Sequence, residues 1–284
     1  MGVGKVSVVI PAFNEGENLV DTVHCILNNS AQQDLEVIVV DDGSTDGSGD
    51  RVERTFVEDG RVSVVRGVEQ GVAGARNLGA SGATGEVLVF LDGHCYTPPG
   101  CIASLTAILE NPEVGMVGPA FASLGHGKGP RGLGVTWRDC SLEIQWLPQQ
   151  GKTPYPVPLL IGACQAMRRE DFGTLGRYDQ GMTRWGSEDL EMCLRVWLMG
   201  YRVLVQPQTV VFHLFRKRHP YEVSGAKILY NQLRMVLLHM STDRIARVFD
   251  YCKAKPEFSR SRRRFQIRRH YDDDWFFSRF SCHI

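Results

Sequence analysis

A carboxylate and an imidazole close a strongly apolar stretch in the first half of the chain. Residues 86–91 (EVLVFL) are followed directly by Asp92, Gly93 and His94. Positions i and i+2 of an extended chain point to the same side, so Asp92 and His94 can converge on one ion. Carboxylate oxygen and imidazole nitrogen both bind divalent metals. The stretch therefore predicts a metal site at the end of a buried strand.

A pair of acidic residues offers a second kind of chemistry. Glu188 and Asp189 open an amphipathic segment that ends near Gly200, and Ser187 precedes them as the expected N-cap. The positive end of a helix dipole favours ionised carboxylates in the first turn, although it also weakens them as bases. Such a carboxylate can act as a general base toward an attacking hydroxyl group.

The elements that must position these residues follow an alternating pattern. Apolar, β-branched runs at residues 6–10, 35–40, 62–65 and 87–91 alternate with helical segments, one of which is the small-residue segment 71–80. This alternation predicts an α/β fold with a mostly parallel sheet flanked by helices. In such sheets ligands bind beyond the carboxyl ends of strands, where residues 11–15, 41–44 and 92–94 all fall. We therefore expect a nucleotide pocket at this edge.

The second half of the chain is less regular. Residues 115–121, 159–167, 203–205 and 210–212 have strand character, and residues 226–239 have helical character. The glycine-rich stretch 125–134 predicts a mobile loop, and residues 137–146 are placed over the acceptor side. We expect a catalytic domain at 1–224, with a nucleotide-binding half (1–122) and an acceptor-binding half (123–224). Residues 225–284 are expected to form a helical, basic C-terminal extension.

Composition excludes several classes of protein. The 284 residues carry a formal net charge of +0, which offers no field that would attract nucleic acid or an anionic membrane. Eight cysteines occur without a CxxC pair, so a zinc site or a disulfide framework is not expected. We see no transmembrane stretch and no signal peptide, and the expected location is cytoplasmic.

Several of these stretches together resemble a known family. Residues 8–15 (VVIPAFNE), 40–46 (VDDGSTD) and 92–94 (DGH) resemble the GT-A nucleotide-sugar glycosyltransferases, family 2 in particular. Residues 185–191 (WGSEDLE), 195–197 (RVW) and 213–221 (HLFRKRHPY) are similar to those of the polypeptide N-acetylgalactosaminyltransferases. Those enzymes carry Asn at the position of Asp189, and we expect neither their membrane anchor nor their lectin domain in this sequence.

The resemblance implies a role for each matching residue at the donor site. Residues of the first two motifs would line the nucleoside pocket or accept from uracil or ribose, and residues of the last motif would close over the phosphates. Arg76 would reach the base or the diphosphate, and Trp185 would wall the sugar site. The implied donor-site residues are Pro11, Phe13, Glu15, Asp41, Asp42, Arg76, Asp92, Trp185, Arg216, His219 and Tyr221.

The resemblance also completes the metal site. His213 would join Asp92 and His94 as the third protein ligand of an ion that bridges the donor diphosphate. A leaving diphosphate gains negative charge, so the reaction needs a hard cation. One carboxylate and two imidazoles in an open site suit Mn²⁺, and less surely Mg²⁺, whereas Zn²⁺ favours a closed tetrahedral set.

Asp189 bears on the stereochemistry of transfer. Inverting enzymes that resemble this one use an Asp at the second position of a Glu-Asp pair as the general base, which the Asn of the retaining relatives cannot do. We therefore favour inversion, with Asp189 as base and Glu188 in contact with the acceptor or the donor sugar. A retaining mechanism stays open.

The acceptor and the class of protein leave further alternatives. The length of the 213–221 motif favours a Ser, Thr or Cys side chain of a peptide, and family 2 at large also includes transfer to glycans or lipid-linked sugars. A nucleotidyltransferase is a remote alternative. It would need a Gly-rich, Lys-containing phosphate loop near the N-terminus, and residues 11–15 are not such a loop. A third possible class is a non-enzymatic sugar- or nucleotide-binding module. Two roles stay open for the basic tail, which ends in acidic and aromatic residues. It could recognise the acceptor, or it could form a homodimer through the extension.

Overall fold

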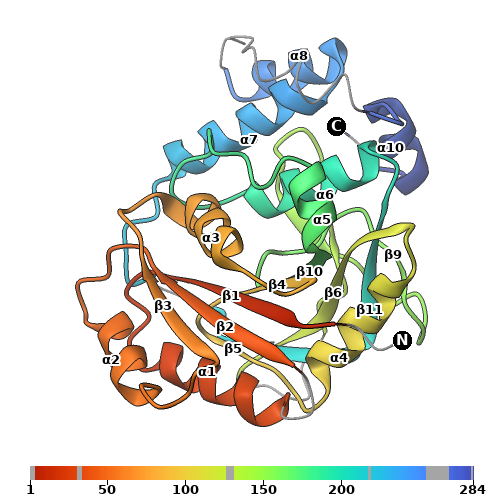
Figure 1. Cartoon of the computed structure of the whole chain (residues 1–284). Helices are drawn as coiled ribbons and strands as arrows, with labels where there is room; N and C mark the ends of the chain where they lie inside the picture. Colours follow the sequence, from red (N-terminus) through yellow and green to blue (C-terminus); the bar gives the residue numbers. More distant parts are fainter. Residues whose placement is uncertain (1–3, 31–33, 126–130, 217–218, 254–268, 283) are drawn as a thin grey trace.

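A nine-stranded sheet forms the centre of the molecule (Figure 1). The computed structural model describes residues 4–30, 34–125, 131–216, 219–253, 269–282 and 284. The strand order is β3-β2-β1-β4-β10-β6-β11-β5, and β9 pairs with β11. The strands are β1 (Val6–Ala12), β2 (Leu35–Asp41), β3 (Val62–Arg66), β4 (Val87–Leu91), β5 (Cys95–Tyr96), β6 (Val114–Ser123), β9 (Tyr155–Pro156), β10 (Cys164–Arg168) and β11 (Arg202–His213).

The predicted parallel arrangement is confirmed for the first half of the chain. Strand β1 pairs in parallel with β2 and with β4, and β2 pairs in parallel with β3. Strand β10 runs antiparallel between β4 and β6, while β6 and β11 are parallel. The mostly parallel α/β fold expected from the sequence is therefore correct, with β10 reversed at the centre of the sheet and the two short strands β5 and β9 antiparallel to β11.

Helices cover both faces of the sheet (Figure 1). Alternate residues of β1 divide between two apolar clusters: Val8 belongs to the cluster beneath α1, α2 and α4, and Val9 belongs to the cluster with α3, α5 and α6. This period of two is what a strand buried on both faces requires. These helices are α1 (Asn18–Asn29), α2 (Ser48–Thr55), α3 (Gly71–Gly82), α4 (Cys101–Thr106), α5 (Arg169–Thr174) and α6 (Glu188–Leu198), and the short helix η1 (Ala107–Glu110) follows α4.

The C-terminal extension packs against the catalytic region. It contains α7 (Gly225–His239), α8 (Thr242–Tyr251) and α10 (Asp273–Phe280). Phe276 and Phe277 are buried, and their ring centroids lie 6.1 and 6.0 Å from that of Trp137 in the small sheet of β7 (Val135–Trp137) and β8 (Ile144–Trp146). The ring of Phe280 lies 5.0 Å from that of Trp197 on α6. Phe276 and Phe277 thus complete the chain's own core, and a homodimer through the extension stays a prediction.

The predicted bounds of elements in the second half of the chain agree only partly with the structure. Segments 203–205 and 210–212 belong to one strand, β11, whose register shifts between Gln206 and Val210. Strand β10 begins only at Cys164, later than the predicted start at 159. Residues 126–130 of the glycine-rich stretch lie outside the described residues, as does most of the basic tail (254–268). Within the ranges given above, every helix falls short of the length and hydropathy of a membrane span.

Candidate active site

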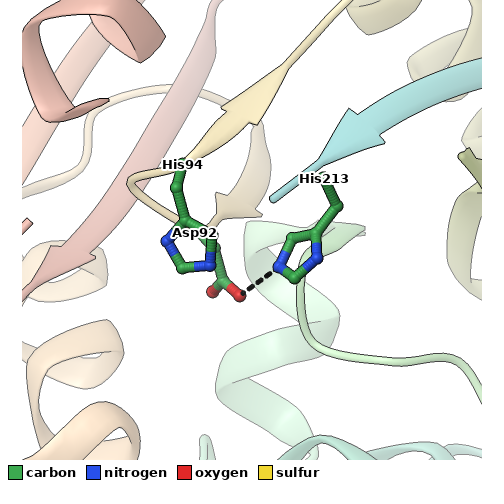
Figure 2. A group of neighbouring side chains, drawn as sticks. All are labelled: Asp92, His94 and His213. Carbon is green, nitrogen blue, oxygen red and sulfur yellow. Dashed lines mark ion pairs between the residues drawn. The ribbon is translucent and has the colours of Figure 1, made fainter. Parts of the chain in front are cut away.

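Asp92, His94 and His213 converge at one edge of the sheet (Figure 2). One potential ligand atom from each residue lies within 4.8 Å of those from the other two. Nε2 of His213 lies 3.7 Å from Oδ2 of Asp92, and the two imidazole centroids are 4.7 Å apart. The predicted ligand set therefore comes together in space.

A tight turn, rather than an extended strand, brings Asp92 and His94 together. The backbone N–H of Cys95 donates to the carbonyl of Asp92 at 3.2 Å, so residues 92–95 form a turn between β4 and β5. The expected convergence of the two side chains is correct, but the extended geometry predicted for it is wrong. His213, the last residue of β11, pairs with Cys95 of β5, and this short antiparallel pairing places the second imidazole beside the turn.

The donor set fits a hard divalent ion in an open site. The three residues would supply three ligands and leave the other positions of a six-coordinate ion open to a substrate or water. Burial would raise the pKa of Asp92, but His213 and the charges of Arg76 and His94 lower it to about 2, which keeps the ligand ionised. Nε2 is the nitrogen of His213 that faces Asp92 and could bind an ion in this group, while Nδ1 is buried without a hydrogen-bond partner among the described residues.

Glu188 and Asp189 lie in the first turn of α6, as predicted. Glu188 accepts from Nη1 of Arg76 at 2.9 Å and from the backbone N–H of Gly186 at 2.9 Å. Asp189 accepts from the backbone N–H groups of Gly162 at 2.6 Å and of Leu190 at 2.9 Å. Both carboxylates are therefore held in fixed positions, and each is engaged by two donors.

Burial changes the protonation expected of this pair. Burial and the neighbouring Asp189 raise the pKa of Glu188 to about 7, even though Arg76 lowers it. Burial also raises the pKa of Asp189, against the lowering effects of Arg76 and the Gly162 N–H. The helix dipole alone would lower both pKa values, so the direction expected from the sequence is wrong for this pair. Ser187, the expected N-cap, has a left-handed backbone (φ 69°) and makes no capping side-chain bond among the described residues.

Arg76 connects the candidate metal ligands (Asp92, His94 and His213, called the metal group below) to the carboxylate pair of Glu188 and Asp189. Its guanidinium donates to Glu188, to Oδ1 of Asp92 at 3.2 Å and to the carbonyl of Gly162 at 2.8 Å, and its carbon Cζ lies 5.3 Å from the ring centre of Tyr178. Only 2% of the residue is exposed. These contacts make Arg76 the buried cation that balances two carboxylates, and its contact with a base or diphosphate stays a prediction.

Asp41 and Asp42 are both buried and already hydrogen-bonded. Asp41 accepts from the Ser44 backbone at 2.9 Å and from Arg66 at 2.6 Å. Asp42 accepts from the backbone N–H groups of Gln70 at 2.9 Å and Gly71 at 2.8 Å, at the start of α3. The structure shows that both hold neighbouring segments in place, Asp41 the turn to Ser44 and Asp42 the start of α3, and acceptance from uracil or ribose stays a prediction.

Aromatic rings and a cation gather where the sequence predicted the donor pocket. The ring of Phe13 lies 5.8 Å from that of Tyr221, and the ring of Trp185, which is 40% exposed, lies 5.6 Å from that of His219. Pro11 is half-buried at the end of β1. The remaining two predicted donor-site residues, Glu15 and Arg216, form an ion pair with each other.

Gly162 bonds to both Arg76 and Asp189, and these two contacts were not predicted from the sequence. A Cβ atom at this position would lie 2.8 Å from Nη2 of Arg76 and 3.0 Å from Cβ of Asp189, so the backbone can approach both only as glycine. The available signal was an isolated glycine next to an apolar strand, which often marks a close approach of backbone.

The comparisons with known proteins agree on a family. The model described as "Glycosyl transferase family 2" matches residues 7–176, and the one described as "N-terminal domain of galactosyltransferase" matches residues 148–219. Polypeptide N-acetylgalactosaminyltransferase 11 of Xenopus tropicalis is 35% identical over 255 residues, which cover 82% of this chain and 42% of the relative. Polypeptide N-acetylgalactosaminyltransferase 3 of Homo sapiens is 34% identical over 257 residues, with 82% and 41% covered. The chain thus spans about two fifths of these relatives.

Solved structures show the same fold. GalNAc-T7 with UDP, GalNAc and Mn²⁺ superposes with a TM-score of 0.85 at 24% identity, covering 98% of this chain and 57% of that chain. The mannosyltransferase PcManGT from Pyrobaculum calidifontis, in complex with GDP-Man and Mn²⁺, gives a TM-score of 0.58 at 22% identity, covering 98% and 73%. Because the first family model spans more than half of the chain, the chain belongs to glycosyltransferase family 2 and has a GT-A fold, with motifs that resemble those of the polypeptide N-acetylgalactosaminyltransferases.

Proposed function

We propose that this chain is a metal-dependent glycosyltransferase that moves a sugar from a UDP-sugar to a peptide. The observation that carries the proposal is the meeting of Asp92, His94 and His213 at the strand ends, joined through Arg76 to the carboxylate pair of α6. A leaving diphosphate needs positive charge, and an acceptor hydroxyl needs a base. The site offers groups for both requirements within one hydrogen-bonded network.

Mn²⁺ is the proposed ion, with Mg²⁺ as the second choice. When bound to Asp92, His94 and His213, it would supply a Lewis acid for the oxygens of the leaving diphosphate. The chain's own residues do the rest: Arg216 adds positive charge beside the site, and Phe13 and Tyr221 offer aromatic walls for a nucleoside. Relatives whose names state N-acetylgalactosamine transfer, and a structural neighbour with UDP and GalNAc, make UDP-N-acetylgalactosamine the first donor to test.

Asp189 is the proposed general base, with inversion at the sugar carbon. The acceptor O–H would give its proton to Asp189 while its oxygen bonds to the anomeric carbon and the bond to the diphosphate breaks. The raised pKa of Asp189 supports this assignment, because it makes the carboxylate a stronger base than an exposed aspartate. Glu188, fixed by Arg76 and Gly186, would contact the sugar or the acceptor.

A Ser, Thr or Cys side chain of a peptide is the proposed acceptor. The names of the curated relatives support a polypeptide. Near His213, the exposed rings of Phe215 and Trp146 lie 6.4 Å apart, which offers apolar contacts to a peptide beside the metal group. Transfer to a glycan or lipid-linked sugar is the alternative outcome. The cytoplasmic location expected from the sequence stays a prediction.

A two-stage experiment tests the proposed function. The full chain is first incubated with a panel of UDP-sugars and Mn²⁺, and release of UDP is measured with and without a chelator. Peptides containing Ser, Thr or Cys are then added, with Ala-substituted peptides as controls, and mass spectrometry detects the added sugar. Release of UDP that persists in chelator contradicts the metal site, and UDP release without sugar on any of the peptides contradicts the peptide acceptor. The anomeric configuration of the product, read by NMR, decides between inversion and retention.

A further inference from the structure

Glu15 lies behind the metal group and contacts two of its neighbours at once. It follows β1 on the turn that leads into α1, and 6% of it is exposed. Its Oε2 atom lies 3.0 Å from Nδ1 of His94. The same carboxylate pairs with the guanidinium of Arg216, whose second contact joins Nη1 and Oε1 at 3.4 Å. The residue therefore joins a potential metal ligand to a cation of the segment that follows β11.

The turn around Glu15 is built to hold this position. Asn14 has a left-handed backbone (φ 57°), and its side-chain oxygen accepts from the backbone N–H of Thr45 at 2.8 Å. The N–H of Gly16 donates to Asp46 at 2.9 Å. A non-glycine residue with positive φ costs free energy and persists only where its surroundings hold it. The two bonds to residues 45 and 46 supply that support on either side of Glu15.

The turn at residues 92–95, which carries Asp92 and His94, leaves room for the Glu15 side chain. A Cβ atom on Gly93 would lie 3.0 Å from Cγ of Glu15 and 3.1 Å from Cδ1 of Leu19. Any other residue between Asp92 and His94 would therefore press on Glu15. The spacing of the two ligands and the position of Glu15 are fitted to each other through this glycine.

Chemistry gives the contact with His94 a direction. An ionised carboxylate can only accept a hydrogen bond, so Nδ1 of His94 would be the donor in this contact, and in the neutral ring Nε2 would keep its lone pair for a metal. Metal-bound histidines nearly always have such a partner on the other ring nitrogen, and loss of it typically weakens metal binding by about 10–100-fold. Phe13 lies on the same loop, but it is Glu15 that contacts the imidazole.

We propose that Glu15 is a positioning residue that fixes His94 for the metal and holds Arg216 beside it, rather than a wall of the nucleoside pocket. The inference rests on the proposed metal-dependent function. It assigns to one carboxylate both the tautomer of His94 and the resting position of the cation that follows His213. Glu15→Ala removes both effects. Glu15→Gln keeps an oxygen that accepts from Nδ1–H, but it loses the charge and one of the two oxygens that pair with Arg216.

The test measures Mn²⁺ binding to the full chain by calorimetry, with no donor present. We expect Glu15→Ala to bind Mn²⁺ about 10–100-fold more weakly than the wild type. Glu15→Gln should recover most of the affinity. The matched control is Glu17→Ala, since the Glu17 side chain is 78% exposed two residues along the same loop and should leave the affinity unchanged. Unchanged affinity in Glu15→Ala would overturn the inference.

A second readout needs no variant. The ¹⁵N chemical shifts of His94 in the metal-free wild type should show a protonated Nδ1 and an unprotonated Nε2, and the reverse pattern would overturn the inference even if Glu15→Ala fails to fold. Failure of the wild type to bind Mn²⁺ would instead contradict the proposed function. The two failures are thus distinguished, because the tautomer of His94 is read without any metal.

Discussion

Nε2 of His213 lies 3.7 Å from Oδ2 of Asp92, although the two residues come from opposite halves of the chain. Asp92 follows β4 near the centre of the sheet, and His213 ends β11 near its edge. The contact forms because β5, two residues long, turns back from β4 and pairs with β11. One short strand thus brings a residue of the predicted nucleotide-binding half beside a residue of the predicted acceptor-binding half.

Asp189→Asn should abolish sugar transfer and leave UDP binding intact. The amide oxygen can still accept from the Gly162 N–H, although the NH2 group cannot accept from the Leu190 N–H as Oδ1 does. The amide cannot take a proton from the acceptor. Transfer is measured by mass spectrometry of the peptide product, and UDP binding by calorimetry with Mn²⁺. Transfer at the wild-type rate in this variant would favour the retaining mechanism.

Arg76→Met should destabilise the fold through charge rather than size. It leaves Asp92 and Glu188 without the buried cation that both contact, and an uncompensated buried charge costs about 3–5 kcal/mol. The free energy of unfolding is measured in urea. Arg61→Met is the control, because Arg61 is 45% exposed and its pair with Asp59 should contribute about 1 kcal/mol or less. Equal stability of the two variants would show that the Arg76 network does not stabilise the fold.

Glu191 should make stability depend on pH on the acid side. Burial would raise its pKa, but Arg195 and His239 lower it from 4.5 to about 2. Because the folded pKa is depressed, this contribution is present above pH 4.5 and is lost as the pH falls toward 2, by about 3 kcal/mol in all. Burial also lowers the pKa of His239 below 6.5, so protonation of the unfolded chain adds to the loss below that pH.

Glu191→Gln is the variant that isolates this effect. It should be less stable than the wild type at pH 7 and should show a flatter dependence of unfolding free energy between pH 5 and 3. Urea titrations at each pH measure both quantities. Glu143→Gln serves as control, since the Glu143 side chain is 63% exposed on the surface. A slope in Glu191→Gln as steep as in the wild type would contradict the assignment.

The C-terminal extension should be required for stability. Phe276 is fully buried between Trp137 and the rest of α10, so Phe276→Ala should cost about 3–5 kcal/mol. Tyr251→Ala at the end of α8, where Tyr251 is 58% exposed, should cost far less. Thermal unfolding compares the two. If Phe276→Ala has the same melting temperature as the wild type, the prediction is wrong, and the extension is a separate unit that serves the acceptor or assembly.

Sequence patterns were enough for the fold and for the positions of the site residues along the chain. Alternating β-branched runs predict β1 to β4, and Asp92 falls at the end of β4 because a polar residue stops a buried strand. The reversed β10 could not be predicted, because its short apolar sequence fits either direction. The order of strands, which decides that β11 lies beside β6, depends on tertiary packing and not on local preference.

Contacts between distant residues were the part that the sequence left open. Arg76 and Glu188 are 112 residues apart, and nothing in either motif shows that a buried guanidinium bonds to that carboxylate. Asp41 and Asp42 match a nucleotide-binding motif, yet their oxygens are occupied by a neighbouring turn and by α3. The raised pKa of Asp189 depends on burial, which the helix-dipole argument does not include.

Metal-dependent binding of UDP tests the central claim most directly. Calorimetry with the full chain should show UDP binding with Mn²⁺ present and lose it in a chelator, since the ion would bridge Asp92, His94, His213 and the diphosphate. His213→Ala should weaken binding in Mn²⁺ at least tenfold, whereas His24→Ala, a histidine packed on Phe56 away from the site, should bind as the wild type does. Equal UDP affinity with Mn²⁺ and with chelator would contradict the account.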